Sequence, residues 1–384
     1  MLSPVKTSIA FVRYKYDPYG GAERFTDAIV RALARDEVDV HIFARKWTKT
    51  APAGVTVHPV GGPTWPSLVR HAFFVWQVDR ALTGKRFDLI QSNERTLSQD
   101  IYRAGDGVHA RWLELRCKGL TWARRLSIHL NPFHRYMCRL ERRLFENPRL
   151  RAVIVNSQMV RKEILARFKI PEEFIHVIYN GVDLDRFHPA NRKTMRAILR
   201  KQNGAGESTF VVLLVGSGFE RKGLEPLMRA FAAVRGDTRL WVVGKGRTLP
   251  YERIAGRLGI MERTKFFGPR EEVIPFYAGA DIFALPTLYD PFPNVILEAM
   301  ASGLPVITTA QCGAAEIIRQ GREGFVVESP QAVDAIRRAI ERMLPREVLR
   351  VMGKAARERA EAFPMEETVR QTEKLYRSLL NTPS

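Results

Sequence analysis

Short apolar runs alternate with helix-length amphipathic segments along the whole chain. In the first half the strand-like runs are SIAFV (8–12), VHIFA (40–44), VTVHPV (55–60), DLIQS (88–92) and AVIVNS (152–157). Residues 23–35 place their apolar side chains at the spacing of one helix face, and a second helix-length segment covers 66–82. This rhythm predicts an α/β domain with a mostly parallel sheet.

The second half repeats the rhythm more clearly. Its strand-like runs are TFVVLLVGS (209–217), LWVVGKG (240–246), KFFG (265–268), IFALPT (282–287), PVITT (305–309) and FVVE (325–328). Continuous apolar runs suit parallel strands that are buried on both faces. They predict a doubly wound sheet, in which ligands bind at the carboxyl ends of the strands.

The length of 384 residues exceeds one ordinary core and predicts two domains. The boundary is expected within 189–208, because this stretch is polar and ends in GAGES, a linker composition. We therefore place an N-terminal domain at 1–188 and a C-terminal domain at 205–362. The last amphipathic segment, 365–384, is expected to pack back on the first domain.

The chain is strongly basic, with 61 Lys and Arg against 41 Asp and Glu, a net charge of +20. Such a field attracts nucleic acid, an anionic membrane or a phosphorylated substrate, and plain solubility is the alternative. No helix-turn-helix, zinc-finger or RNP pattern is present, so we expect no nucleic-acid partner. Three widely spaced cysteines form neither a disulfide framework nor a zinc site. Without a signal peptide or an apolar span, the protein is expected to be cytoplasmic, with at most peripheral membrane contact.

The loop after the run 209–217 reads GSGFERKG and opens a helix. Its glycines, its backbone N–H groups and the cations Arg221 and Lys222 form a candidate diphosphate cradle. A solvated Arg–Lys pair at a helix start is the alternative. The next two strand-end loops offer Gly244, which permits close approach of a ligand, and Arg270, which could stack on a nucleotide base. Plain turns are the alternative for both.

Two carboxylates mark the segment 287–309, which reads strand, loop, helix, strand. Asp290 lies in the loop, and Glu298 lies inside the helix. Carboxylates accept hydrogen bonds from sugar and ribose hydroxyls, so both acids could face a ligand at the helix start. Helix capping by Asp290 and a solvated Glu298 are the alternatives.

The same helix start is a candidate phosphate site, because helix N-termini carry a positive dipole end and unpaired N–H groups. The helix is predicted to begin near Asn294. Pro291 and Pro293 have no N–H, so the donors would be those of Phe292, Asn294 and Val295.

The first half holds two further candidates. Gly20 and Gly21 follow the first strand and open the first helix, which is a phosphate-loop position. Asp106 lies between glycines in YRAGDGVHARW, with His109 nearby. Ordinary turns are the alternative for both.

Taken together, GGAER, NGVDLDRF, VGSGFERKG and YDPFPNVILEAMASGLPVITT resemble the retaining family-4 glycosyltransferases of the GT-B fold, over nearly the whole chain. YKYDPYGGAER and IYRAGDGVHARW are further similar to the members that add α-1,3-linked glucose to the lipopolysaccharide core. The resemblance implies two Rossmann-like α/β domains facing across a cleft, with the last helix crossing back to the first. It implies a nucleotide-diphosphate sugar donor such as UDP-glucose, a phosphorylated glycolipid acceptor, retention of configuration, and neither a metal nor another cofactor.

The resemblance also implies a role for each candidate residue. These roles are diphosphate binding by Gly21, Arg221, Lys222, Asn294 and Val295; sugar binding by Asp290 and Phe292; ribose binding by Glu298; base binding by Arg270 and Gly244; and catalysis by Asp106 and Asp290. The family usually has Glu where this chain has Asp290, so the shorter side chain leaves the donor sugar open.

Two other functions fit the same residues. One is transfer to a different acceptor, such as an exopolysaccharide or capsule precursor. The other is a protein of this fold that binds a sugar nucleotide without transferring the sugar. The intact Arg–Lys pair and both acids favour an active transferase.

The segment 111–151 holds 11 Arg and Lys against 3 Glu, interleaved with Trp and Leu. This composition suits a helix in an anionic membrane interface, at the inner face of the cell membrane. The cations could instead bind acceptor phosphates. A long helix with one core face and one solvated face is the remaining alternative.

Overall fold

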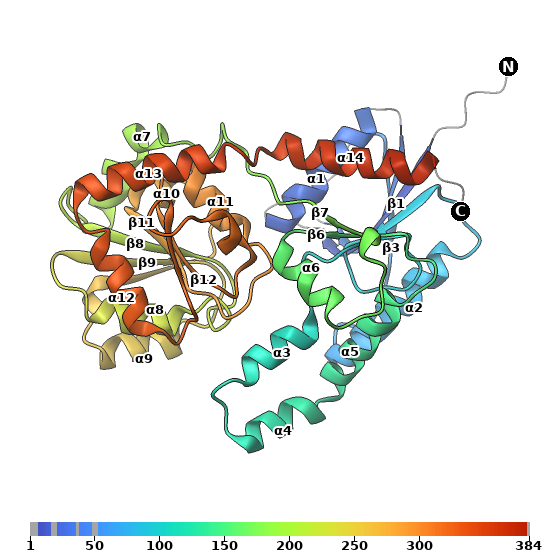
Figure 1. Cartoon of the computed structure of the whole chain (residues 1–384), viewed down its shortest axis with the longest axis horizontal. Coiled ribbons are helices and arrows are strands. Elements are labelled where there is room, and N and C mark those ends of the chain that lie inside the picture. Colours follow the sequence, from blue (N-terminus) through green and yellow to red (C-terminus); the bar gives the residue numbers. More distant parts are fainter. Residues whose placement is uncertain (1–6, 17–20, 36–37, 48–52, 382–384) are drawn as a thin grey trace. The chain divides into compact units, whose positions relative to one another are not determined.

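The computed structural model describes residues 7–16, 21–35, 38–47 and 53–381. The chain divides into two compact units. The first comprises Met1–Tyr179 and Glu366–Ser384, and the second comprises Asn180–Met365. Figure 1 shows that each unit has a sheet with helices on both of its faces.

Within its described residues, the first unit has a seven-stranded parallel sheet with the order β3-β2-β1-β4-β5-β6-β7. Its strands are β1 (Ser8–Tyr16), β2 (Asp39–Trp47), β3 (Val55–Pro59), β4 (Leu89–Ser92), β5 (Ile101–Arg103), β6 (Ala152–Val155) and β7 (Ile175–Val177). Its helices are α1 (Gly21–Arg35), α2 (Ser67–Leu82), α3 (His109–Cys117), α4 (Trp122–Leu130), α5 (Pro132–Phe145), α6 (Gln158–Leu165) and α14 (Met365–Asn381).

The C-terminal helix α14 belongs to the core of the first unit. Leu375 and Tyr376 are buried in one cluster with Ile9 and Phe11 of β1. The Tyr376 hydroxyl donates a hydrogen bond to Gln91 Oε1 at 2.6 Å, which satisfies both buried polar groups.

The second unit has a six-stranded parallel sheet in the described chain, with the order β10-β9-β8-β11-β12-β13. Its strands are β8 (Phe210–Val215), β9 (Thr238–Val243), β10 (Thr264–Gly268), β11 (Ile282–Leu285), β12 (Val306–Thr309) and β13 (Gly324–Val327). Its helices are α7 (Asn191–Gln202), α8 (Leu224–Ala232), α9 (Leu249–Arg257), α10 (Ile274–Gly279), α11 (Asn294–Ala301), α12 (Val333–Arg342) and α13 (Arg346–Ala360). Strands such as β8 and β11 are buried at every residue, as their continuous apolar runs predicted.

The boundary between the units differs from the predicted one. Residues 180–188, expected in the first domain, belong to the second unit, because Val182 pairs with Pro364 and Arg357 donates to Leu184 O at 3.1 Å. The stretch 189–208 was predicted to be a linker but contains the helix α7, which packs against α10.

The basic segment is three helices, α3, α4 and α5, inserted between β5 and β6 (Figure 1). The alternative of a single long helix is therefore wrong. The chain breaks at Gly119, which has a positive φ of 76°, and again at the Asn131–Pro132 step, where Asn131 caps α5. No helix in the described parts of the chain is long and apolar enough to cross a membrane.

Candidate functional site

The loops after β8 and β11 are neighbours, because these two strands pair in the sheet. From β8 the chain proceeds to β9 and β10 on one side, and then returns to β11, β12 and β13 on the other. Ligands of open α/β sheets bind where the strand order reverses in this way. The switch point of the second unit therefore brings together the loop 216–223 and the loop 286–293.

Lys222 and Asp290 form a buried ion pair at this switch point. The Lys222 ammonium lies 2.6 Å from Asp290 Oδ2, and both side chains are buried. Arg221 reaches the same carboxylate oxygen at 3.3 Å from its Nη1, while its side chain stays 42% exposed. One carboxylate thus holds two adjacent cations at the carboxyl ends of the strands.

Backbone contacts lock the two loops together. The Arg221 carbonyl accepts hydrogen bonds from the Thr287 hydroxyl and from Leu288 N, both at 2.8 Å. Gly223 has a φ of 73°, and a Cβ there would lie 1.9 Å from Pro286 O. Only glycine permits this approach, so the sequence ERKG places its two cations against the β11 loop.

Both alternative readings of these residues are corrected by the structure. Lys222 is buried and paired, so it is not part of a solvated Arg–Lys pair. Asp290 does not cap the following helix, since the N-cap position of α11 is Pro293 and no side chain caps it.

Glu298 lies on α11 and is buried, which excludes the solvated alternative. The Tyr277 hydroxyl of α10 donates a hydrogen bond to its Oε2 at 2.9 Å. A buried carboxylate that is held by a tyrosine is a preorganised acceptor for hydroxyl groups. The sequence reasoning did not include Tyr277, and a tyrosine within the buried run of α10 was the available signal.

Asn180 orients the start of α11. Its side-chain amide donates to Phe292 O at 3.0 Å and to Asn294 Oδ1 at 2.6 Å. Phe292 is buried, whereas Asn294 and Val295 are half-buried. Asn180 was quoted only within NGVDLDRF, and its contact across more than a hundred residues has no local sequence signal.

The two predicted base-binding residues differ in their surroundings. Gly244 follows β9, and a Cβ there would lie 2.0 Å from Gly216 O, so glycine is required for the packing of the two loops. Arg270 is exposed after β10, and within the described part of the chain it forms no hydrogen bond or ion pair with the other predicted site residues. Gly244 therefore has a packing role between the two loops. Base binding by Gly244 or Arg270 stays a prediction.

The first unit carries the other two candidates. Gly21 is the first residue of α1, and Gly20 lies outside the described residues. Asp106 precedes α3, and its side chain is 78% exposed. Its carboxylate lies 3.9 Å from the Arg95 guanidinium.

Glu141 holds the Asp106 loop through hydrogen bonds to Arg95 and to the backbone of His109. This buried carboxylate of α5 accepts from Arg95 Nε at 2.9 Å and from His109 N at 2.7 Å. Arg95 in turn donates to Gly107 O at 3.0 Å. Glu141 occupies a core-facing position of α5 beside Leu140 and Leu144, and a charge at a core position was the available signal.

His109 is held in its neutral form. Burial, followed by the charges of Arg95, His134 and His71, lowers the pKa of this imidazole to about 3. Its Nε2 lies 3.1 Å from His134 Nδ1. His109 is therefore a neutral hydrogen-bonding group at physiological pH. Within the described residues, no group of three or more His, Cys, Asp or Glu is arranged to hold a metal ion.

Comparison with known proteins accounts for both units. Residues 19–186 match the family described as Glycosyltransferase Family 4, and residues 209–346 match Glycosyl transferases group 1. The chain is 30% identical over 301 residues to a Burkholderia thailandensis protein named "Probable transglycosylase BTH_I0986", covering 78% of this chain and 76% of that protein. The chain belongs to glycosyltransferase family 4. The predicted family is confirmed.

Among the relatives of this family-4 glycosyltransferase is the lipopolysaccharide glucosyltransferase WaaG of Escherichia coli K12. The two are 26% identical over 347 residues, which cover 89% of this chain and 91% of WaaG. A crystal structure of WaaG superposes with a TM-score of 0.84 at 24% identity, covering 96% and 99% of the two chains. Anabaena HepE in complex with UDP and glucose superposes with a TM-score of 0.74 at 22% identity, covering 96% and 99%. These matches confirm the predicted fold, with two Rossmann-like units of the GT-B type.

Proposed function

We propose that this glycosyltransferase moves a hexose, most simply glucose, from a nucleotide-diphosphate sugar to a phosphorylated glycolipid of the lipopolysaccharide core type, with retention of configuration. The observation that carries the donor half is the buried ion pair of Lys222 with Asp290, flanked by Arg221 at the switch point. HepE binds UDP-glucose, and WaaG is a lipopolysaccharide glucosyltransferase, which supports this choice of donor and acceptor.

Each donor group has a matching partner in the site. Arg221 and Lys222 would neutralise the diphosphate, aided by the backbone N–H groups at the start of α11. The Glu298 carboxylate would accept hydrogen bonds from the ribose hydroxyls, and Tyr277 orients it. Asp290 would bind the sugar hydroxyls while it holds the two cations in place.

Preorganised positive charge is what this reaction needs most. As the bond between the anomeric carbon and the diphosphate oxygen breaks, its electron pair passes to that oxygen. Fixed cations in a site of low dielectric stabilise this charge more in the transition state than in the ground state. We expect the transfer to need no metal, since Arg221 and Lys222 supply the charge.

Retention follows if the acceptor attacks from the face that the leaving group vacates. The acceptor oxygen forms the new bond to the anomeric carbon, and its proton passes to the departing phosphate oxygen. No protein nucleophile takes part in this scheme. Asp106 is proposed to position the sugar or acceptor, and the contacts of Arg95 and Glu141 hold its loop.

The acceptor half of the proposal rests on the helices α3 to α5. No residue of α4 is buried, and its Trp122, Leu126 and Leu130 are exposed at a spacing of four residues, with Trp122 78% exposed. Arg124 and Arg125 lie between them on the same helix. Exposed tryptophan and leucine with adjacent arginines suit the interface of an anionic membrane, where a glycolipid acceptor resides. We propose peripheral attachment to the cytoplasmic face of the cell membrane through 111–151.

A transfer assay tests the proposal. The purified protein is incubated with labelled UDP-glucose and with lipopolysaccharide core that ends in phosphorylated heptose, with and without EDTA. We expect label in the glycolipid, an α-linkage by NMR, and no loss with EDTA. No label in the glycolipid would refute this pair of donor and acceptor, and a β-linked product would refute retention.

A further inference from the structure

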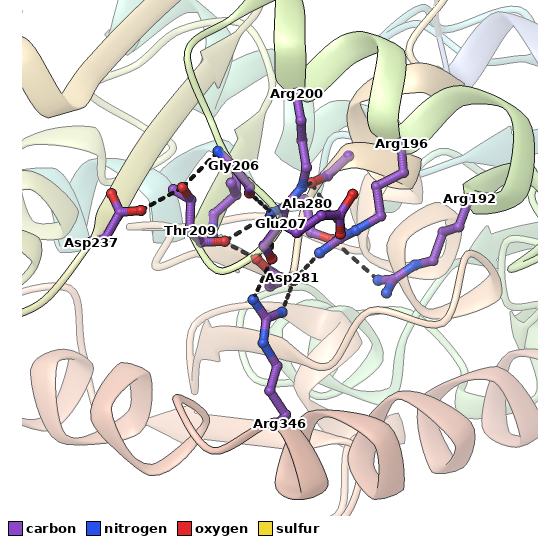
Figure 2. Close-up of polar contacts among 12 residues, drawn as sticks. Arg192, Arg196, Arg200, Gly206, Glu207, Thr209, Asp237, Ala280, Asp281 and Arg346 are labelled. Atoms are coloured by element: carbon purple, nitrogen blue, oxygen red, sulfur yellow. Dashed lines mark hydrogen bonds and ion pairs between the residues drawn. The ribbon is translucent and has the colours of Figure 1, made fainter.

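The C-terminal unit has a second charged region. It lies at the amino ends of the strands, whereas Lys222 and Asp290 lie at their carboxyl ends. Asp281 directly precedes β11, so it lies at the amino ends of the parallel strands. Its buried carboxylate receives Arg196 at 2.7 Å, Arg200 at 2.6 Å and Arg346 at 3.1 Å. Figure 2 shows Arg196 and Arg200 of α7 reaching Asp281 from one side and Arg346 of α13 from the other.

Arg196 and Arg200 have a sufficient structural explanation. Arg196 donates to Ala280 O at 2.9 Å and Arg200 donates to Gly279 O at 2.8 Å, so both satisfy carbonyls at the C-terminal end of α10. Cations are favourable at that end of a helix. These contacts fasten α7 to α10 and to the start of β11.

Arg192 contacts the same carbonyl of Ala280, but most of its guanidinium has no partner among the described residues. It follows the same helical spacing as Arg196 and Arg200, and it makes one hydrogen bond, from its Nη2 to Ala280 O at 3.2 Å. Among the described residues its Nε and Nη1 have no hydrogen-bonding partner, and it forms no ion pair with a carboxylate. Burial, and after it the neighbouring Arg196, lower its pKa to about 10.

A cavity of about 570 Å³ opens beside Arg192. Five basic residues line it, namely Arg192, Arg346, Arg350, Lys354 and Arg357. The three acidic residues that line it are each paired with one of these: Asp281 with Arg346, Glu358 with Lys354, and Glu361 with Arg357. Arg350 pairs with Glu347, which does not line the cavity. Arg192 thus remains as an unbalanced cation in its wall.

Two helix starts add to the positive potential. The first turns of α7 and α13 both line the cavity, through Arg192 and Arg346. Neither helix has a side-chain cap, and α7 has no acidic residue in its first turn. Helix N-termini favour anions and disfavour cations, so Arg192 at the start of α7 is in an unfavourable position unless an anion lies near it, whereas Arg346 at the start of α13 is already paired with Asp281.

We infer that this cavity is a binding site for a phosphorylated small molecule, separate from the donor site. Guanidinium groups bind phosphate oxygens through two parallel hydrogen bonds, and Arg192 has donors available for them. The volume is that of an ordinary small-molecule site and is large enough for a diphosphate or a nucleotide. The inference is independent of the proposed transfer reaction, because none of its residues belongs to the loops after β8 and β11.

Hydrogen–deuterium exchange with inorganic pyrophosphate tests the site on the full chain. We expect protection of the first turns of α7 and α13 in the wild type. The double variant Arg192→Gln/Lys354→Gln should lose this protection and weaken the corresponding binding step in calorimetry by about tenfold or more. Arg192 makes a single backbone contact and Lys354 is exposed, so these changes leave the Asp281 network in place.

Lys201→Gln is the matched control, because it removes one positive charge from an exposed position of α7 outside the cavity. It should retain the protection. The inference is wrong if pyrophosphate protects neither helix start, if the double variant is protected as strongly as the wild type, or if chloride of equal ionic strength gives the same protection. Protection confined to the loops 216–223 and 286–293 would assign pyrophosphate to the donor site alone and would also overturn it.

Discussion

At the scale of single residues, the proposed donor site depends on one carboxylate that organises two cations. Asp290 keeps Lys222 at 2.6 Å and Arg221 at 3.3 Å, so the charge that meets a diphosphate is in place before the ligand arrives. Such preorganisation avoids reorganisation at the moment of reaction.

Lys222→Ala is expected to lower kcat by about 10²–10³, the loss typical when one preorganised electrostatic contact to a developing charge is removed. Steady-state transfer or donor hydrolysis measures this. Arg229→Ala is the control, because it removes an exposed cation of the following helix α8 that pairs only with Glu225. Equal activity of the wild type and Lys222→Ala would contradict the assignment of the diphosphate site.

Glu141→Gln tests the support of the Asp106 loop. The change keeps the shape of the side chain but leaves Arg95 without its buried carboxylate partner. We expect a loss of stability of about 1–3 kcal/mol and a lower kcat, because the backbone near Asp106 and His109 loses its charged anchor. Denaturant unfolding and transfer rates measure the two effects. A variant with reduced stability and unchanged kcat would show that Glu141 only stabilises the unit.

Site residues within one local segment could be predicted from the sequence, and those whose contacts join distant segments could not. Arg221, Lys222, Asp290 and Glu298 were chosen as candidates because each lies in a strand-end loop or the helix after it, where ligand chemistry is expected. Asn180 and Tyr277 were not found, because their contacts join segments that are distant in sequence. The pairing of Asp290 with Lys222 was also not predicted, because the spacing of a motif does not show which charged side chains form an ion pair.

At the scale of elements, α4 is the least buried helix of the basic segment. Its apolar side chains point to solvent, whereas α5 buries Met137, Leu140 and Leu144. Exposed apolar surface of this kind marks an interaction site.

Trp122→Glu/Leu126→Glu should abolish flotation of the protein with anionic liposomes while leaving its melting temperature unchanged, because neither side chain is buried. Lys201→Gln, an exposed charge change in the other unit, should float like the wild type. Binding by the double variant, or no binding by the wild type at physiological salt, would contradict membrane contact through α4.

Asp281 links α7, α13 and β11, and its ionisation should make the second unit sensitive to acid. Burial alone would raise the pKa of Asp281, but Arg196 and Arg200 outweigh it and hold the pKa below its ordinary value. A carboxyl with a lowered folded pKa stabilises the protein above its ordinary pKa of 3.8, and this contribution is lost as the pH falls through the folded value.

Asp281→Asn should therefore cost about 3–5 kcal/mol near neutral pH, because it leaves buried arginines without their carboxylate. The difference in melting temperature between the wild type and the variant should narrow as the pH falls below 3.8. If the melting temperatures of the wild type and the variant differ by the same amount at neutral pH and below pH 3.8, the lowered pKa of Asp281 is contradicted.

Helices and strands were predicted correctly where the buried residues are apolar. They were missed where the element is very short or its buried side is polar. The buried strands were evident as apolar runs, but β5 and β7 have three residues each and carry no periodicity. The helix α7 was taken for a linker because NRKTMRAILRKQ is polar. Its arginines face inward to Asp281 and the carbonyls of α10, so its buried side is charged rather than apolar.

At the scale of the whole molecule, the chain is a family-4 glycosyltransferase of two units, each with its own parallel sheet and core. The proposed donor-binding residues Arg221, Lys222, Asp290 and Glu298 all belong to the second unit. Donor binding can therefore be measured on the full chain before any acceptor is known.

A thermal-shift screen against a panel of nucleotide-diphosphate sugars tests the central claim most directly. A ligand that binds only the folded state raises the melting temperature, by an amount that grows with its concentration over Kd. We predict a rise with one nucleotide-diphosphate sugar, most simply UDP-glucose, that is lost in Glu298→Ala and Lys222→Ala. No rise with any member of the panel, or an equal rise in both variants, would contradict the donor site at the β8–β11 switch point.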